Sequence, residues 1–86
     1  MNFKENEFKE KLEGAHSFPG GYTFKFIVKS EDQKKVEELV DEAEIKIKTS
    51  SGNKYVSVTL EAKVKSSDEV IAVYKKAKKI EGLIAL

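Results

Sequence analysis

EIKIKTSSGNKYVSVTLEAKV, residues 44–64, is a stretch in which apolar and polar residues alternate on both sides of a glycine–asparagine pair. Alternation with a period of two is typical of β-strands that bury one face. Gly52-Asn53 separates the two alternating runs, and glycine there supplies the positive φ that tight hairpin turns require. The stretch therefore predicts a hairpin of two antiparallel strands.

A two-residue turn fixes which residues of this hairpin face each other. Ser51 then pairs with Lys54, and further along the ladder Ile47 lies opposite Val58. Directly opposed residues share a face of the sheet, so all the apolar residues of the hairpin fall on one face. These inward residues are Ile45, Ile47, Val56, Val58, Leu60, Ala62 and Val64.

A strand pattern and a helix pattern precede the hairpin. YTFKFIVK (22–29) alternates, with Ile27 as the one apolar residue on its polar face. SEDQKKVEELVDEA (30–43) carries an apolar stripe of helical spacing, and Ser30 and Gln33 are spaced as a capping box. These patterns predict a strand followed by an amphipathic helix.

A helix pattern and a strand pattern also follow the hairpin. SSDEVIAVYKKAKKIEG (66–82) opens with a second capping box, Ser66 and Glu69, and stops at Gly82. Four lysines crowd its last turns, where the helix dipole is negative and accounts for them. LIAL (83–86) is a short, uncharged strand pattern.

Two strand–helix–strand crossovers joined by a hairpin most economically give a four-stranded antiparallel sheet with both helices on one face. This is the ferredoxin-like βαββαβ arrangement of the α+β class, with an expected strand order of 4-1-3-2. Phe8 and Leu12 lie one turn apart near the N-terminus and predict an added helix. The 86 residues therefore form a single domain, with residues 1–14 as a helical extension and 22–86 as the core.

The composition argues against catalysis and against a metal or other cofactor. The chain has no cysteine, and His16 is its only histidine, too few for a zinc site of three or four ligands. Nothing in the spacing suggests a nucleophile and an acid around that histidine, and a surface or loop-packing residue is the favoured interpretation. The carboxylates mostly stand near lysines at helical spacing, which indicates solvated surface pairs. We expect no enzyme activity.

The segment HSFPGG (16–21) could be read as a ligand loop, but its position favours a turn. Glycine-rich phosphate loops follow a strand and precede a helix, whereas Gly20-Gly21 precedes the first predicted strand. No apolar run approaches the length of a membrane span, and residues 1–14 lack the apolar core of a secretory signal. These features favour a cytoplasmic protein without a membrane partner.

The surface with most potential for binding is the sheet face away from the two predicted helices, together with the C-terminal strand. The candidate interface residues are Lys25, Ile27, Lys46, Lys48, Tyr55, Leu83, Ile84 and Leu86. RNA-recognition modules of this fold stack bases on that face. All 16 basic residues are lysine, however, and one outward tyrosine without arginine makes a poor stacking platform.

The two predicted sheet edges differ in their protection. The strand at 44–49 exposes lysines, which discourage the addition of another strand. The strand at 83–86 has neither charge nor proline, so it needs a cover, which is either the N-terminal helix or a second subunit.

Three segments together resemble a known family: SFPGGYTFKFIV, SSGNKYVSVTL and SSDEVIAVYKKAKKIEGLIAL. They are similar to the YbeD-like family of small bacterial proteins of unknown function, from about Phe8 to the C-terminus. The resemblance implies a ferredoxin-like fold and a similarity to ACT regulatory domains, which bind small metabolites, often at subunit interfaces. It supplies no catalytic residues. The segment VKSED (28–32) lacks the glycine common in the corresponding ACT loop, which argues against amino-acid binding there.

Two functions follow as hypotheses of different classes. The leading one is a non-catalytic regulatory or protein-interaction module resembling ACT domains, which self-associates through the sheet face or the C-terminal edge and takes a small-molecule effector. The alternative is single-stranded nucleic-acid binding on the outer sheet face, which the lack of arginine and of further rings disfavours.

Overall fold

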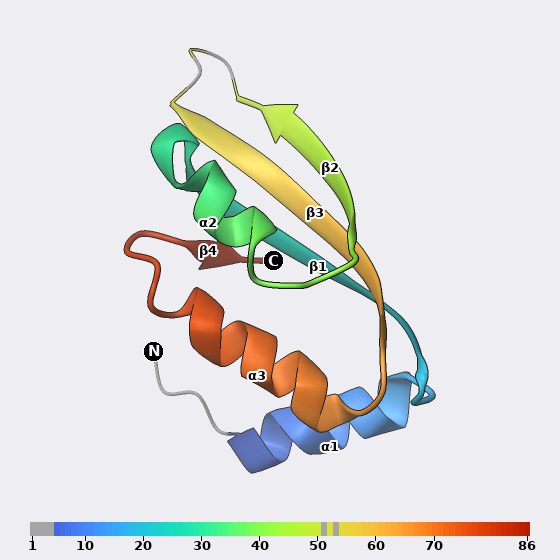
Figure 1. The fold of residues 1–86 in the computed structure, drawn as a ribbon. Coiled ribbons are helices and arrows are strands. Elements are labelled where there is room, and N and C mark those ends of the chain that lie inside the picture. The colour runs from blue at the N-terminus through green and yellow to red at the C-terminus, as the bar shows by residue number, and fades with distance from the viewer. Residues whose placement is uncertain (1–4, 51, 53) are drawn as a thin grey trace.

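The computed structural model describes residues 5–50, 52 and 54–86 and confirms the ferredoxin-like fold. The elements are α1 (Glu5–Ala15), β1 (Gly20–Lys29), a 3-10 turn η1 (Ser30–Asp32), α2 (Gln33–Glu37), β2 (Glu44–Thr49), β3 (Tyr55–Val64), α3 (Ser67–Ala77) and β4 (Ile84–Ala85). The strands form one antiparallel sheet in the order β2-β3-β1-β4, which is the predicted order read from the other edge (Figure 1).

The hairpin register predicted from the sequence is confirmed. Ile47 lies opposite Val58 and Ile45 opposite Leu60 in the β2–β3 ladder. The turn residues Ser51 and Asn53 lie outside the described residues, while Gly52 has the expected positive φ of 82°. The alternating pattern therefore set both the pairing and the face of each side chain.

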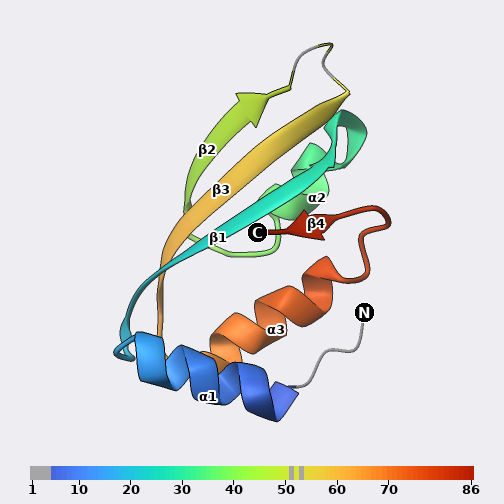
Figure 2. The same cartoon turned by 180° about the vertical axis from the view of Figure 1, so that it is seen from behind.

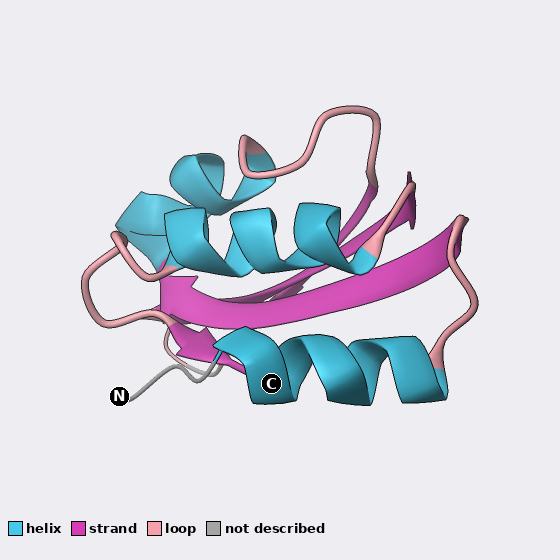
Figure 3. Cartoon of the chain, turned by 90° about the horizontal axis from the view of Figure 1, so that it is seen from below, coloured by secondary structure: helices cyan, strands magenta, loops and turns pink. Residues whose placement is uncertain are grey.

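The core lies between the two central strands and the helices that cover one face of the sheet. Figure 3 shows two helices, α2 and α3, on the same side of the strands. Phe24 and Phe26 of β1 and Val58 and Leu60 of β3 are fully buried beneath them. From the helix side, Val70, Ile71, Val73 and Ala77 of α3 and Val36 of α2 complete this core.

The capping box predicted at Ser66 forms in a modified way. The Glu69 backbone N–H donates to the Ser66 hydroxyl oxygen at 3.4 Å, as expected of an N-cap. The Glu69 carboxylate accepts from the Lys65 backbone N–H at 3.1 Å rather than from that of the cap residue. The helix ends at Ala77, before the stop predicted at Gly82, and residues 78–82 form turns.

The helix predicted at 30–43 is wrong in its start and its length. The first three residues form η1, and α2 has only five residues, with Lys29 and Asp32 as cap residues whose side chains make no cap bond. After α2 the Leu39 backbone N–H bonds to the Val36 carbonyl at 3.0 Å, and Glu42 takes a positive φ of 56°. The chain turns here because it must pass over the sheet to reach β2 at the far edge, which overrides helix propensity.

The short α2 also leaves β2 less covered than predicted. Ile45 and Ile47 do lie on the helix side of the sheet, but each is 40% exposed. Every residue of β2 is exposed, because none of the described helices reaches over this edge strand. The prediction that these isoleucines face the core is correct for direction and wrong for burial.

The predicted N-terminal helix forms as α1, and it packs on α3 rather than over the sheet (Figures 1 and 2). Leu12 is buried, and the Phe8 ring meets the Tyr74 ring edge-on at a centroid distance of 5.2 Å. The Ser67 hydroxyl donates to the Glu13 carboxylate at 3.0 Å and further ties the two helices. Residues 1–4 of the predicted extension lie outside the described residues.

The two glycines after Pro19 belong to β1 instead of forming a loop before it. Gly20 pairs with Val64 and Gly21 with Lys63 at the start of the β1–β3 ladder. A Cβ atom at Gly20 would lie 2.6 Å from the Ser17 carbonyl oxygen, so only glycine fits this close approach. Glycine at position 20 is therefore required by backbone packing.

Candidate functional site

The outer face of the sheet, opposite α2 and α3, is a surface that no described helix covers. Figure 2 looks onto this face, where β2, β3 and β1 are crossed by no helix and α1 lies beyond the ends of the strands. Seven of the eight predicted interface residues lie here: Lys25, Ile27, Lys46, Lys48, Tyr55, Ile84 and Leu86. The eighth, Leu83, is half-buried and packs against the core.

The strand register arranges these side chains in rows across the sheet. One row runs from Lys48 through Ser57 and Ile27 to Ile84, and so crosses all four strands. In the next row Lys46 and Lys25 flank Thr59. The Leu86 backbone N–H donates to the Lys25 carbonyl at 2.9 Å, which extends this row to the C-terminal residue.

The outer face is divided into an apolar side and a basic side. Ile84 is 54% and Leu86 63% exposed beside the half-buried Ile27, so the β4 side of the face is apolar. Lys46 and Lys48 stand on β2 at the opposite side, and both are exposed. Scattered exposed apolar residues are common on proteins, whereas adjoining ones rimmed by charge are typical of interaction sites.

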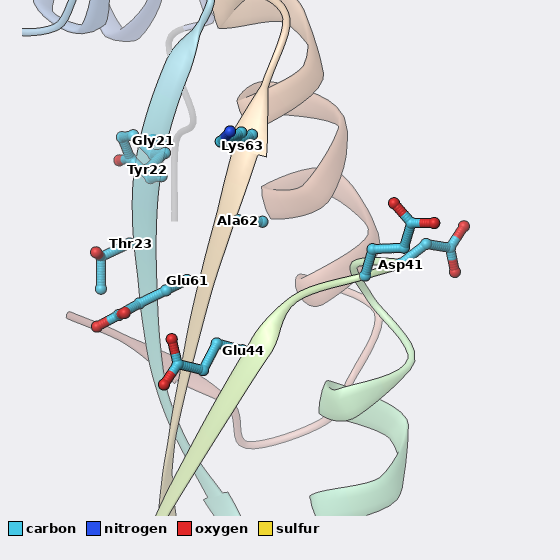
Figure 4. Close-up of a pocket in the computed structure, with 9 residues that line it drawn as sticks. Gly21, Tyr22, Thr23, Asp41, Glu44, Glu61, Ala62 and Lys63 are labelled. Carbon is cyan, nitrogen blue, oxygen red and sulfur yellow. The ribbon is translucent and has the colours of Figure 1, made fainter.

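Carboxylates lie at the end of the outer face away from the hairpin turn. Glu44 and Glu61 are directly paired across β2 and β3, and Figure 4 shows their side chains on the same side of the sheet as Thr23. The Lys46 ammonium lies 3.3 Å from a Glu61 carboxylate oxygen and offsets the repulsion between the two acids. Asp41, on the turn before β2, points away from them (Figure 4). Across the described residues, no group of three or more acidic or histidine side chains is placed to hold a metal ion.

Two open hollows adjoin Tyr55 at the hairpin end of the sheet. The smaller, about 200 Å³, is lined on the outer face by residues that include Ile27, Lys48 and Ser57. The larger, about 410 Å³, lies at the corner after β1 and is lined by Lys29, Ser30, Glu31, Lys54 and Tyr55. Tyr55 is 45% exposed and lines both hollows, so its ring can contact a bound molecule in either one.

His16 and the aromatic cluster lie away from the outer face. The exposed His16 ring meets the Tyr22 ring edge-on at a centroid distance of 5.0 Å, in agreement with the surface or loop-packing residue expected from the sequence. Burial, together with a 3.4 Å hydrogen bond between the Tyr22 and Tyr74 hydroxyls, raises the pKa of Tyr74 above its ordinary value. Tyr22 of β1 and Tyr74 of α3 belong to the packing between the sheet and α3, because both rings also contact Phe24.

Sequence reasoning identified most of the outer face but missed its acidic end. Glu44 and Glu61 were not expected to lie opposite each other, although the predicted register implies it. The exposure of Ile45 and Ile47 on the helix side was also missed, because it depends on where α2 stops. None of the helices in the described part of the chain is long and apolar enough to cross a membrane.

Comparison with known proteins gives one match. The model of a family described as protein of unknown function (DUF493) matches residues 13–86, which confirms the expected small family of unknown function. No curated protein and no solved structure matches the chain.

Proposed function

Since the chain belongs to the DUF493 family, whose function is unknown, we propose a function from its own surface: a non-catalytic, regulatory protein-interaction module. The outer face of the sheet is its binding surface. Its partner is a protein segment that presents apolar side chains next to carboxylates. The observation that carries the proposal is the division of one uncovered face into an apolar side and a basic side.

The apolar side supplies the affinity in this proposal. Ile84 and Leu86 are each more than half exposed beside Ile27, so a partner side chain laid across them removes apolar surface from water. Burying the exposed part of each residue contributes about 1 kcal/mol, at roughly 25 cal/mol per Å². Lys25 lies in the row of Leu86 and gives a carboxylate of the partner an ion pair beside this patch.

The basic side supplies orientation and selectivity. Lys48 and Lys46 lie on β2, at the opposite end of the rows that reach β4. A partner that spans the face therefore contacts apolar side chains at its β4 end and lysines at its β2 end. Glu44 and Glu61 close the face at the end away from the hairpin turn and disfavour acidic groups there. The charges on this face therefore favour a negatively charged segment and one orientation of that segment across the sheet.

A second candidate, single-stranded nucleic acid, is favoured by Tyr55. Its exposed ring lies opposite Lys29 in the β1–β3 ladder, so a base can stack there with its phosphate near a lysine. It is the only ring among the outer-face residues that the structure describes, and the chain has no arginine, so the protein partner is preferred.

A small anionic effector is the third ligand class to test. The hollow of about 410 Å³ beside Lys29 and Lys54 has the size of a small-molecule site. Glu31 also lines it and opposes an anion, so this effector is secondary to the protein partner.

The test is a backbone amide NMR titration of the protein with three probes in parallel. These are a synthetic peptide of alternating glutamate and leucine, an oligothymidylate, and a mixture of amino acids and small organic acids. We expect the peptide to shift the resonances of Lys48, Ile27 and Ile84, and Ile84→Asp to abolish the shifts. Lys48→Glu weakens peptide binding, whereas Lys79→Glu, an equal charge change beyond α3, leaves it unchanged. Shifts produced only by the oligothymidylate, or no shift on the outer face with any probe, would overturn the proposal.

A further inference from the structure

The edge strand β2 has the features of a strand that pairs with another strand. It is six residues long, all six residues are exposed, and it pairs with β3 on one side only. An edge strand presents a row of unpaired backbone groups to any strand that fits beside it. β4, at the other edge, has only two residues and offers far fewer such groups.

The direction of the free backbone groups of β2 follows from its ladder with β3. The Ser50 backbone N–H donates to the Tyr55 carbonyl at 2.9 Å, which marks a hydrogen-bonded pair. Hydrogen-bonded and non-hydrogen-bonded pairs alternate along an antiparallel ladder, and the β2–β3 register continues from Thr49 back to Glu44 without interruption. The even-numbered residues of β2 therefore bond toward β3, and Ile45 and Ile47 direct their N–H and C=O groups to the free edge.

The side chains of β2 complement those of a second, antiparallel β2. When the two-fold axis passes through Lys46, Ile45 of each copy lies opposite Ile47 of the other. These are the residues whose backbone groups reach the free edge, so the pairing satisfies the hydrogen-bonding alternation. In the same register Glu44 of each copy lies opposite Lys48 of the other, and both pairs are of opposite charge.

Neighbouring two-fold registers fit less well. An axis at Ile47 places Lys46 of one copy opposite Lys48 of the other. Glu44 then has no partner within β2 of the other copy, because that strand ends at Thr49. An axis at Ile45 pairs only three residues of each strand, because β2 begins at Glu44. The axis at Lys46 brings the two Lys46 side chains together, but each has the Glu61 carboxylate of its own chain at 3.3 Å.

We propose that β2 of one copy pairs with β2 of a second copy, antiparallel about an axis at Lys46, and joins the two sheets into one. Four isoleucines, each 40% exposed in the single chain, then form a continuous apolar strip on the helix side of the joined sheet. Lys48, one of the lysines expected to discourage strand addition, instead favours this register, because the antiparallel copy places Glu44 opposite it. The pairing leaves the apolar side of the outer face free, because that side lies at the opposite edge, but it shares Lys46 and Lys48 of β2 with the proposed function. Sedimentation of the protein without a peptide tests the pairing independently of that function.

The pairing is reversible at moderate concentration. Five residues from each strand and four isoleucines bury less surface than the roughly 1,600 Å² of a standard interface. We therefore expect a dissociation constant of about 10–100 μM, in the range of transient association.

Charge exchange tests the register by sedimentation equilibrium of the full chain over about 10 μM to 1 mM, concentrations that span the expected constant. Glu44→Lys places lysine opposite Lys48 in both pairs, and we expect about tenfold weaker dimerisation. Adding Lys48→Glu to that variant exchanges the charges and restores the dimer. Glu81→Lys, at an exposed site after α3, is the matched control and leaves the dimer unchanged. A wild-type monomer up to 1 mM, or a double variant as weak as Glu44→Lys, overturns the inference.

Amide hydrogen exchange gives a second readout that needs no substitution. We expect the exchange of the Ile45 and Ile47 amides to slow as the protein concentration rises, because these N–H groups become bonded to the second copy. The amide of Lys79, an exposed residue after α3, serves as reference and is independent of concentration. Concentration-independent exchange at both isoleucines contradicts strand pairing even if the protein dimerises elsewhere.

Discussion

Gly20→Ala is the substitution for which the structure makes the sharpest prediction, because a neighbouring glycine provides its control. The added methyl group at position 20 would lie 2.6 Å from the Ser17 carbonyl oxygen. This atom belongs to the backbone and cannot rotate away as a side chain can. A Cβ atom at Gly21, one residue along the same strand, meets no atom within 4 Å.

The expected magnitude combines two opposing effects. Forcing an extra carbon into a filled site costs about 1–3 kcal/mol, since the backbone around residues 17–20 must move. Replacing glycine by alanine also restricts the unfolded chain, which stabilises the folded state by about 0.4–1 kcal/mol. The cost exceeds the gain over most of these ranges, so Gly20→Ala should lower the free energy of unfolding by up to about 2.6 kcal/mol. Gly21→Ala keeps only the favourable effect and should raise it by up to about 1 kcal/mol.

The assay is thermal and urea denaturation followed by far-ultraviolet circular dichroism on both variants and the parent. A change of 1 kcal/mol corresponds to a shift of about 4–8 °C in Tm for a domain of this size. We expect Tm to fall for Gly20→Ala and to stay level or rise for Gly21→Ala. Equal Tm values for the two variants would refute the argument that close packing on Ser17 requires glycine at position 20.

Three further predictions concern the core, a helix cap and alkaline pH. Phe24→Ala removes a fully buried ring and should cost about 3–5 kcal/mol, most of the stability of a domain this small, as measured by urea titration. Ser66→Ala removes the hydroxyl that accepts from the Glu69 N–H and should cost about 0.5–1 kcal/mol; Ser66→Asp, which keeps an acceptor, should retain the parent stability in the same titration. Burial raises the pKa of Tyr74 in the folded protein above its value of about 10 in the unfolded chain. The protonated Tyr74 hydroxyl therefore contributes fully to the free energy of unfolding below about pH 10, and this contribution is lost as the pH rises toward the folded pKa. Tyr74→Phe should therefore show a smaller fall in urea midpoint than the parent between about pH 9 and pH 11, and equal falls would contradict the raised pKa.

The strand pairing was predictable from the sequence because local patterns determine it. Alternation fixes the face of each strand residue, and the turn at Gly52 fixes the register, so Ile47 opposite Val58 followed from counting residues. The same reasoning placed Lys25 and Lys48 on one face before any coordinates were considered. The outer face is thus largely a consequence of period-two patterning.

The length of α2 and the exposure of β2 could not be predicted in this way. The stripe that includes Val36 and Leu39 is compatible with a helix of four turns, yet the chain leaves the helix after Glu37. That exit depends on the distance from β1 to the far edge of the sheet, which is a property of the whole fold. Ile45 and Ile47 accordingly face the helix layer without being covered by it.

The central position of β1 has a consequence for the newly made chain. β1 is flanked by β3 and β4, both of which follow it in the sequence and are synthesised later. During translation the rings of Phe24 and Phe26 must therefore wait for β3 and α3 to emerge from the ribosome before they are shielded from water. Until then the apolar face of β1 is exposed to water, which makes this strand a target for chaperones that bind nascent chains.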